Sequence, residues 1–232
     1  MADTNRTINP ENVSTGGPVE GACCFTSFAE GVELPTDAST ALAVEGGSFE
    51  NLGELSDQGW TTATSTTINK FKGYHGGTLL SEVADEEVTV KVEFVEIVRA
   101  TVLKIRFGVA NVEVEQDGFV RKITPTTVPG VVLPLVFDSL LSNGVVERVV
   151  FPRAKIESVD DEAHVKGGLR VYGMTFSALV DDAGHARYIY YARLSELDAD
   201  DDDEETGGDD NGGDDNGGSD NTNTETNQTT NP

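Results

Sequence analysis

The sequence has few of the residues that usually carry catalysis, metal binding or cross-links. It contains two cysteines, Cys23 and Cys24, which are adjacent, and three histidines, His75, His164 and His185. Neighbouring cysteines rarely satisfy disulfide geometry, so we expect two small apolar side chains and no cross-link. The histidines fall in Gly- or Asp-containing turns without a nucleophile at a familiar spacing, which favours surface histidines over catalytic ones. The sequence therefore predicts no enzyme, no metal site and no cofactor.

Basic residues are also scarce. The sequence has 16 Lys and Arg and 41 Asp and Glu, which gives a formal net charge of −25. Of the 41 acids, 13 lie in residues 198–232, where there is no base, which leaves 28 acids against 16 bases in residues 1–197. Tight binding of DNA or RNA requires a dense Lys and Arg surface, so this composition excludes a nucleic-acid-wrapping protein. The charge is also typical of proteins from high-salt hosts, although ordinary acidic proteins share it.

Long hydrophobic runs are absent as well. No stretch approaches the roughly 18 apolar residues that a membrane-spanning helix needs. The first ten residues, Met1–Pro10, are polar and are not typical of a secretion signal. We therefore expect a protein that is made and used in aqueous surroundings, with no membrane insertion.

The sequence divides into three zones. Residues 1–40 are polar and dotted with Gly and Pro, which indicates an N-terminal arm. Residues 41–197 hold nearly all the strand-like pattern. Residues 198–232 contain no hydrophobic residue beyond Ala199, so they predict a disordered acidic tail. A five-residue Gly/Asp/Asn repeat in that tail lacks the apolar residues of calcium-binding repeats, which favours a solvated, self-repelling segment over a calcium site.

The middle zone predicts a mainly β protein, either a β-sandwich or a small barrel of about eight strands. In Val88–Phe94, apolar residues alternate with polar ones, which predicts a strand with one buried face. Gly168–Val180 follows the same pattern, with Tyr172, Met174, Phe176 and Ala178 on one side. Asp117-Gly118 and Asn143-Gly144 are suited to tight hairpin turns between neighbouring strands.

Two segments of the middle zone do not follow this alternation. Val98–Gly108 predicts a short helix with an apolar stripe of Val98, Val102 and Ile105, although a β-branched strand is the competing interpretation. Residues 47–72 predict a long loop that contains the only tryptophan, Trp60, among threonines. Because disordered loops seldom carry tryptophan, we expect an arm that lacks a partner within its own chain and folds against a partner subunit.

Taken in order, several segments resemble the major tail tube proteins of long-tailed, siphovirus-like bacteriophages and archaeal tailed viruses. The resemblance covers about residues 20–195, and order and spacing carry it. Its segments are Gly31–Leu42, Phe49–Gly59, the Gly76-Gly77 turn, a long strand to Val95, a helix ending in Phe107-Gly108, and a late hairpin arm Glu147–Ile156.

The resemblance implies a tail-tube type of β-sandwich or barrel with one short helix and long inter-subunit arms. It implies a virion structural protein whose hexameric rings stack into the tail tube through which viral DNA passes. Expected partners are other copies of the chain and the tape measure, tail terminator and tail tip proteins. The expected location is the virion tail, and the host cytoplasm during assembly. The acidic tail departs from the family pattern, and we expect it outside the tube.

Two alternatives remain open. One is another virion β protein, such as a head–tail connector or decoration protein. The other is an acidic β-sandwich module that binds calcium or carbohydrate. For the tube, the expected subunit or ring contacts are Leu34, Pro35, Glu54, Asp57, Trp60, Thr61, Thr64 and Thr67. The polar strand face of Thr89, Lys91 and Glu93 is a candidate lumen face, although an outer solvent face would look the same.

Overall fold

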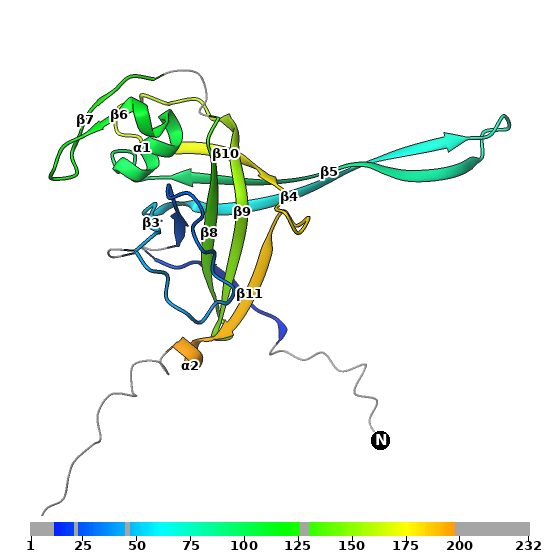
Figure 1. The fold of residues 1–232 in the computed structure, drawn as a ribbon, viewed down its shortest axis with the longest axis horizontal. Helices are drawn as coiled ribbons and strands as arrows, with labels where there is room; N and C mark the ends of the chain where they lie inside the picture. The colour runs from blue at the N-terminus through cyan, green and yellow to red at the C-terminus, as the bar shows by residue number, and fades with distance from the viewer. Residues whose placement is uncertain (1–11, 21–22, 45–46, 126–129, 198–232) are drawn as a thin grey trace, which may run out of the picture. The chain divides into compact units, whose positions relative to one another are not determined.

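The computed structural model describes residues 12–20, 23–44, 47–125 and 130–197, and they form a mainly β protein, as expected (Figure 1). Nine strands make one sheet with the order β3-β2-β8-β9-β10-β5-β4, with β1 on β8 and β11 on β9; β6 and β7 make a separate hairpin. The strands are β1 (Gly16–Pro18), β2 (Cys24–Thr26), β3 (Glu50–Asn51), β4 (Leu55–Lys72), β5 (Thr78–Phe94), β6 (Val112–Val114), β7 (Val120–Ile123), β8 (Val132–Leu141), β9 (Val145–Val159), β10 (Tyr172–Leu179) and β11 (Tyr188–Arg193).

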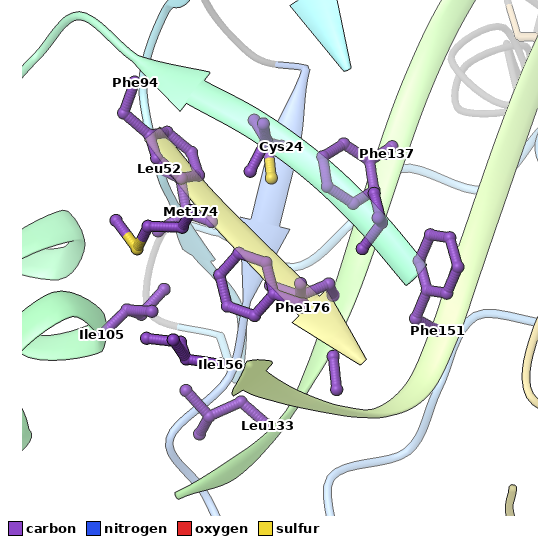
Figure 2. Packing of buried hydrophobic residues seen from close by; sticks show 14 of the residues in the cluster. Cys24, Leu52, Phe94, Ile105, Leu133, Phe137, Phe151, Ile156, Met174 and Phe176 are labelled. Carbon is purple, nitrogen blue, oxygen red and sulfur yellow. The ribbon is translucent and has the colours of Figure 1, made fainter. Parts of the chain in front are cut away.

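The alternating strands form the core where the pattern predicted it. Val88, Val90, Val92 and Phe94 of β5 are all buried, and so is the predicted inner face of β10. These side chains pack with residues of β2, β8 and β9 in one cluster (Figure 2). The turns at Asp117-Gly118 and Asn143-Gly144 join β6 to β7 and β8 to β9, and both glycines have positive φ angles.

The large sheet folds over on itself. Strand β9 pairs with β11 up to Val150 and with β10 from Arg153 onward, so it changes neighbour at Pro152. The pairing of β8 with β9 shifts register at the same point, and such irregularities let strands turn corners between packed layers. As a result, strands far apart in the sheet order face each other across the core.

The predicted loop over residues 47–72 is wrong, because most of this segment is strand. It contains β3 and the 18-residue β4, which pairs with β5 along its length. Hydrophobic alternation failed here because most of β4 has no buried face, so neither set of alternate side chains needs to be apolar. The β-branched threonines of this segment suit a strand, and composition was the signal available.

The predicted helix is confirmed as α1 (Ala100–Phe107). It ends at Gly108, whose φ of 93° lies in the region that glycine favours. Val102 and Ile105 are buried as expected, but Val98 lies before the helix and is 78% exposed, so its place in the apolar stripe was wrong. A 3-10 turn (Val109–Asn111) and the four-residue α2 (Leu194–Leu197) are the other helical elements of the described residues.

The N-terminal zone contributes to the folded domain. Strands β1 and β2 both precede residue 41 and pair with β8, and Ala38 is buried. The predicted boundary at residue 40 therefore does not mark the start of the fold. The acidic tail, residues 198–232, lies outside the described residues, as do residues 1–11.

Candidate assembly surface

The outer parts of β4 and β5 form a two-stranded hairpin, residues 61–87, which we call the arm. Figure 1 shows it extending away from the rest of the fold. Every residue of the arm is exposed except Thr62 and Gly73, which are half-buried. Since β4 is the last strand of the sheet order, the outer edge of the arm has no strand partner among the described residues. Unpaired strand edges of this kind are templates for pairing with another chain.

The outer half of the arm, residues 68–83, carries apolar side chains on both of its faces. Ile68 lies opposite Val83 on one face, and Phe71 lies opposite Leu80 on the other. These four side chains are about half exposed or more, and Tyr74 at the turn is fully exposed. Isolated two-stranded hairpins are at best marginally stable in water, and clustered exposed apolar residues mark interaction sites. The arm therefore has the chemistry of a segment that binds another surface.

Trp60 anchors the base of the arm within its own chain. Its ring stacks on Phe137 of β8 with 4.7 Å between ring centroids, and it is half-buried against the core. The expectation that Trp60 lacks an internal partner is wrong, because the folded-over sheet brings β4 against β8. This contact joins strands four positions apart in the sheet order, and a single sequence does not reveal such a contact.

The structure brings most of the other predicted contact residues to β4. Thr61, Thr64 and Thr67 are exposed on the arm. Asp57 is exposed near the start of β4 and accepts a hydrogen bond from the Gln58 side chain. Glu54 precedes the strand and is half-buried. Sequence reasoning missed the apolar residues farther out, although the Gly-rich turn at 73–77 marks the hairpin to which they belong.

Leu34 and Pro35 lie away from the arm. Both are half-buried, and Leu34 packs against a small core cluster of the same chain that contains Phe25, Phe49 and Val136. The segment that carries them is therefore held on its own domain.

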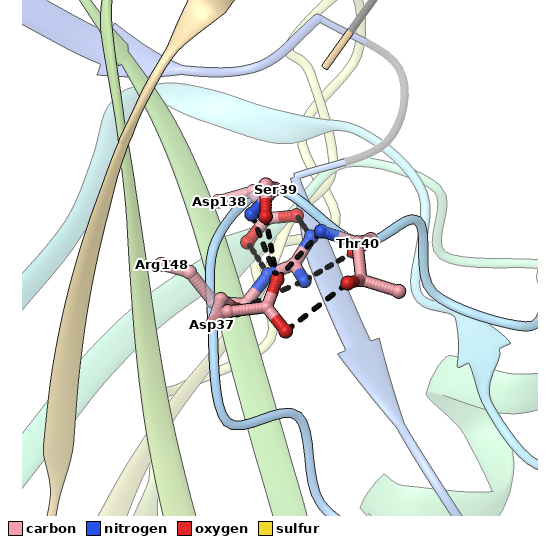
Figure 3. A network of polar contacts seen from close by, with 5 residues as sticks. All are labelled: Asp37, Ser39, Thr40, Asp138 and Arg148. Atoms are coloured by element: carbon pink, nitrogen blue, oxygen red, sulfur yellow. Dashed lines mark hydrogen bonds and ion pairs between the residues drawn. The ribbon is translucent and has the colours of Figure 1, made fainter. Parts of the chain in front are cut away.

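A buried ion pair fixes that segment. Arg148 of β9 donates two hydrogen bonds to the carboxylate of Asp138 on β8, at 2.8 and 2.9 Å (Figure 3). It also donates to the backbone carbonyls of Asp37, at 3.3 Å, and Thr40, at 2.7 Å. The Asp37 carboxylate accepts hydrogen bonds from Thr40 and Ser39, and the bond from the Thr40 backbone does most to lower the pKa of Asp37.

The candidate lumen residues share the face of β5 that points away from the core. Lys91 forms an ion pair with Asp160 at 2.8 Å, which raises the pKa of Lys91. Glu93 accepts a hydrogen bond from Ser56, and Thr89 is half-buried. The polar strand face is confirmed, whereas its position in a tube stays a prediction.

A cleft lies between α1 and the β6–β7 hairpin, at the opposite end of β5 from the tip of the arm. Its volume is about 680 Å³, within the roughly 300–1,000 Å³ typical of binding pockets. Apolar side chains line much of it, and basic side chains stand beside them. The lining includes Ile97, Val98, Leu103, Phe119, Val120, Ile123 and Tyr172, with the bases Arg121, Lys122 and Arg170 and the acid Asp117.

The described residues contain no group of three or more His, Cys, Asp or Glu side chains placed to hold a metal ion. The three histidines are exposed, and both cysteines are completely buried without a disulfide. Burial raises the pKa of the Cys23 thiol to about 11 and also raises that of Cys24. A raised thiol pKa opposes nucleophilic chemistry, because the thiolate is the reactive form.

Across the described part of the chain, every helix is too short or too polar to cross a lipid bilayer. Comparison with known proteins finds neither a matching family model nor a similar curated protein.

Proposed function

We propose that this protein is a virion structural protein whose copies assemble into stacked hexameric rings, forming the tail tube through which viral DNA passes. The fold would then be of the tail tube type, and the tape measure, terminator and tail tip proteins would be its partners. The ring order and these partners rest on the resemblance of residues 20–195 to siphovirus-like tail tube proteins.

The arm is the observation that supports self-assembly best. About 27 residues, a seventh of the described chain, form a hairpin that contributes almost nothing to the core of its own domain. Its apolar side chains would remain in water in a monomer. Association of copies removes that apolar surface from water, which stabilises the assembly by about 25 cal/mol for each Å² buried.

The polar face of β5 suits the conduit that the proposal requires. It continues onto β10, where Ser177 lies opposite Thr89 and Thr175 opposite Lys91. Among the hydroxyl side chains of this face, Lys91 is already paired with Asp160, and Lys155 of β9 lies opposite Ser177, so the face offers few free cations to hold phosphate groups. DNA would therefore slide past this face without tight binding.

Negative-stain electron microscopy of the purified full chain, at rising protein and salt concentrations, tests the proposal. We expect stacked hollow rings or tubes. Single rings would indicate a head–tail connector instead, and monomers at every condition would contradict assembly and favour a binding module.

A shortened arm provides the matched variant. Replacement of residues 67–85 by Asn-Gly joins Thr66 to Glu86, which are already paired across the hairpin, through a two-residue turn. Because the deleted residues are exposed apart from Gly73, which packs against Leu79 of the same segment, the variant should unfold at the temperature of the unmodified protein and fail to assemble. Tubes from a correctly folded variant would refute the role of the arm.

A further inference from the structure

We propose that the cleft between α1 and the β6–β7 hairpin binds the outer half of the arm of a second copy of this protein. The inference rests on the proposed function, since it supposes that copies associate, and it adds the surface that receives the arm.

The cleft combines an apolar interior with a rim of three basic side chains and one acidic side chain, Asp117. Leu103 and Tyr172 are buried beneath it, and Phe119 beside them is 60% exposed. Arg121 is paired with Glu115 and Lys122 with Glu113, so among the described residues Arg170 supplies the positive charge of the rim that has no ion-pair partner. An aromatic side chain left in water at the mouth of a cleft is typical of a contact site, since aromatic residues and arginine are enriched in protein interfaces.

One face of the arm has the complementary character. Phe71 and Leu80 are directly opposite each other, and Asn69 and Glu82 form the next pair on the same face. This face therefore presents two large apolar side chains beside a carboxylate. The opposite face carries Lys70, which would meet Arg170 unfavourably. Charge thus selects the Phe71–Leu80 face for the cleft.

The arm cannot reach the cleft of its own chain. The tip precedes the first residue of β5, and the cleft begins just after its last residue. Seventeen residues of strand at about 3.3 Å each separate the two by roughly 55 Å. Figure 1 shows the free end of the arm and the β6–β7 hairpin on opposite sides of the fold.

The tip of the arm and the cleft lie at the two ends of β5, and this placement also determines how copies would join. The contact uses different surfaces on the two partners, so each copy keeps a free arm or a free cleft after one contact forms. Heterologous contacts of this kind generate rings or open polymers rather than closed dimers. The cleft therefore supplies a head-to-tail link of the type that a stacked tube needs.

Charge reversal tests the contact. Glu82→Arg and Arg170→Glu, made singly in the full chain, should each raise the protein concentration needed for assembly about tenfold at low salt, and the double variant should recover most of that loss. Arg193→Glu is the control, since it makes the same charge change on β11 and should leave assembly unaltered. Single variants that assemble like the unmodified chain would overturn the proposal.

Engineered cysteines give a second readout. A mixture of Leu80→Cys and Phe119→Cys chains, assembled and then oxidised, should form a covalent dimer that neither variant forms alone. The native thiols should not interfere, since both are completely buried. Dimers of Leu80→Cys alone would indicate arm-to-arm contact and overturn the proposal.

The outcomes separate this inference from the proposed function. Tubes that form without the mixed dimer and without sensitivity to charge reversal would leave the tube function standing and refute the cleft contact. Chains that stay monomeric under all conditions would refute both. If deletion of residues 198–232 and Arg170→Glu each improved assembly, the acidic tail would be the occupant of the cleft, and the proposal would fail.

Discussion

Replacement of Arg148 should be among the most damaging single changes to this fold. The side chain of Arg148 is 5% exposed and that of Asp138 is 12% exposed, and the pair is held by two hydrogen bonds. Arg148→Met keeps much of the apolar stem but leaves a buried carboxylate without its cation. Breaking a buried pair in this way costs about 3–5 kcal/mol. Loss of the bonds to the Asp37 and Thr40 carbonyls adds to that cost, so we expect at least about 4 kcal/mol.

Urea unfolding followed by circular dichroism would measure this change. With a slope of about 2 kcal/mol/M, a loss of about 4 kcal/mol lowers the unfolding midpoint by about 2 M. The control is the double variant Arg148→Met/Asp138→Leu, which removes both charges. It should recover a large part of the loss, because apolar replacements of buried pairs are often neutral.

Two results would refute this reasoning. A midpoint shift below about 0.5 M for Arg148→Met would mean that water or another group compensates the carboxylate. A double variant no more stable than the single one would mean that the carbonyl contacts to the 37–40 segment, which both variants lose, dominate the cost rather than the unpaired charge.

Three further predictions concern other parts of the domain. Trp60→Ala should lower the free energy of unfolding by about 2–3 kcal/mol through loss of its stacking on Phe137, measured by thermal melting, and an unchanged melting temperature would contradict the contact. The pKa of Asp37 is lowered in the folded state, so the difference in unfolding free energy between the unmodified protein and Asp37→Ala should depend on pH. The difference should be complete above the ordinary carboxyl pKa near 4 and should disappear as pH falls through the lowered value. A difference that persists at the lowest pH would be inconsistent with this. Cys23 and Cys24 should react with a thiol reagent at pH 8 only after unfolding, and rapid labelling of the native protein would show that the core opens.

The parts of the fold with one buried face were predictable from sequence. In β5 the alternation from Val88 to Phe94 gave both the strand and the side chains that enter the core. Over residues 78–87, the part of β5 within the arm, apolar and polar residues do not alternate, because neither face of the strand is buried by its own chain. The extent of β4 could not be predicted from hydrophobic periodicity for the same reason.

Contacts between strands far apart in the sheet order were the other feature that could not be predicted from sequence. The stacking of Trp60 on Phe137 depends on the sheet folding over, which no local pattern reveals. The Arg148–Asp138 pair could not be placed from the turn either, because a two-residue Asn143-Gly144 turn would set Asp138 opposite Val149, whereas the observed register sets it opposite Arg148. The apolar tip residues of the arm were visible in the sequence, but their exposure required the structure.

The exposure of the arm has a consequence for how this protein can change over generations. Most substitutions in a close-packed domain are limited by the stability they cost, and residues 65–87 of the arm are almost free of that limit because their two strands pair only with each other. Mutations there can alter the contacts of the hairpin while the domain keeps its thermal stability. We therefore expect the folding stability of the domain to tolerate insertions, deletions and polar exchanges in the arm far better than in β8 or β9, so that assembly contacts and folding can change independently.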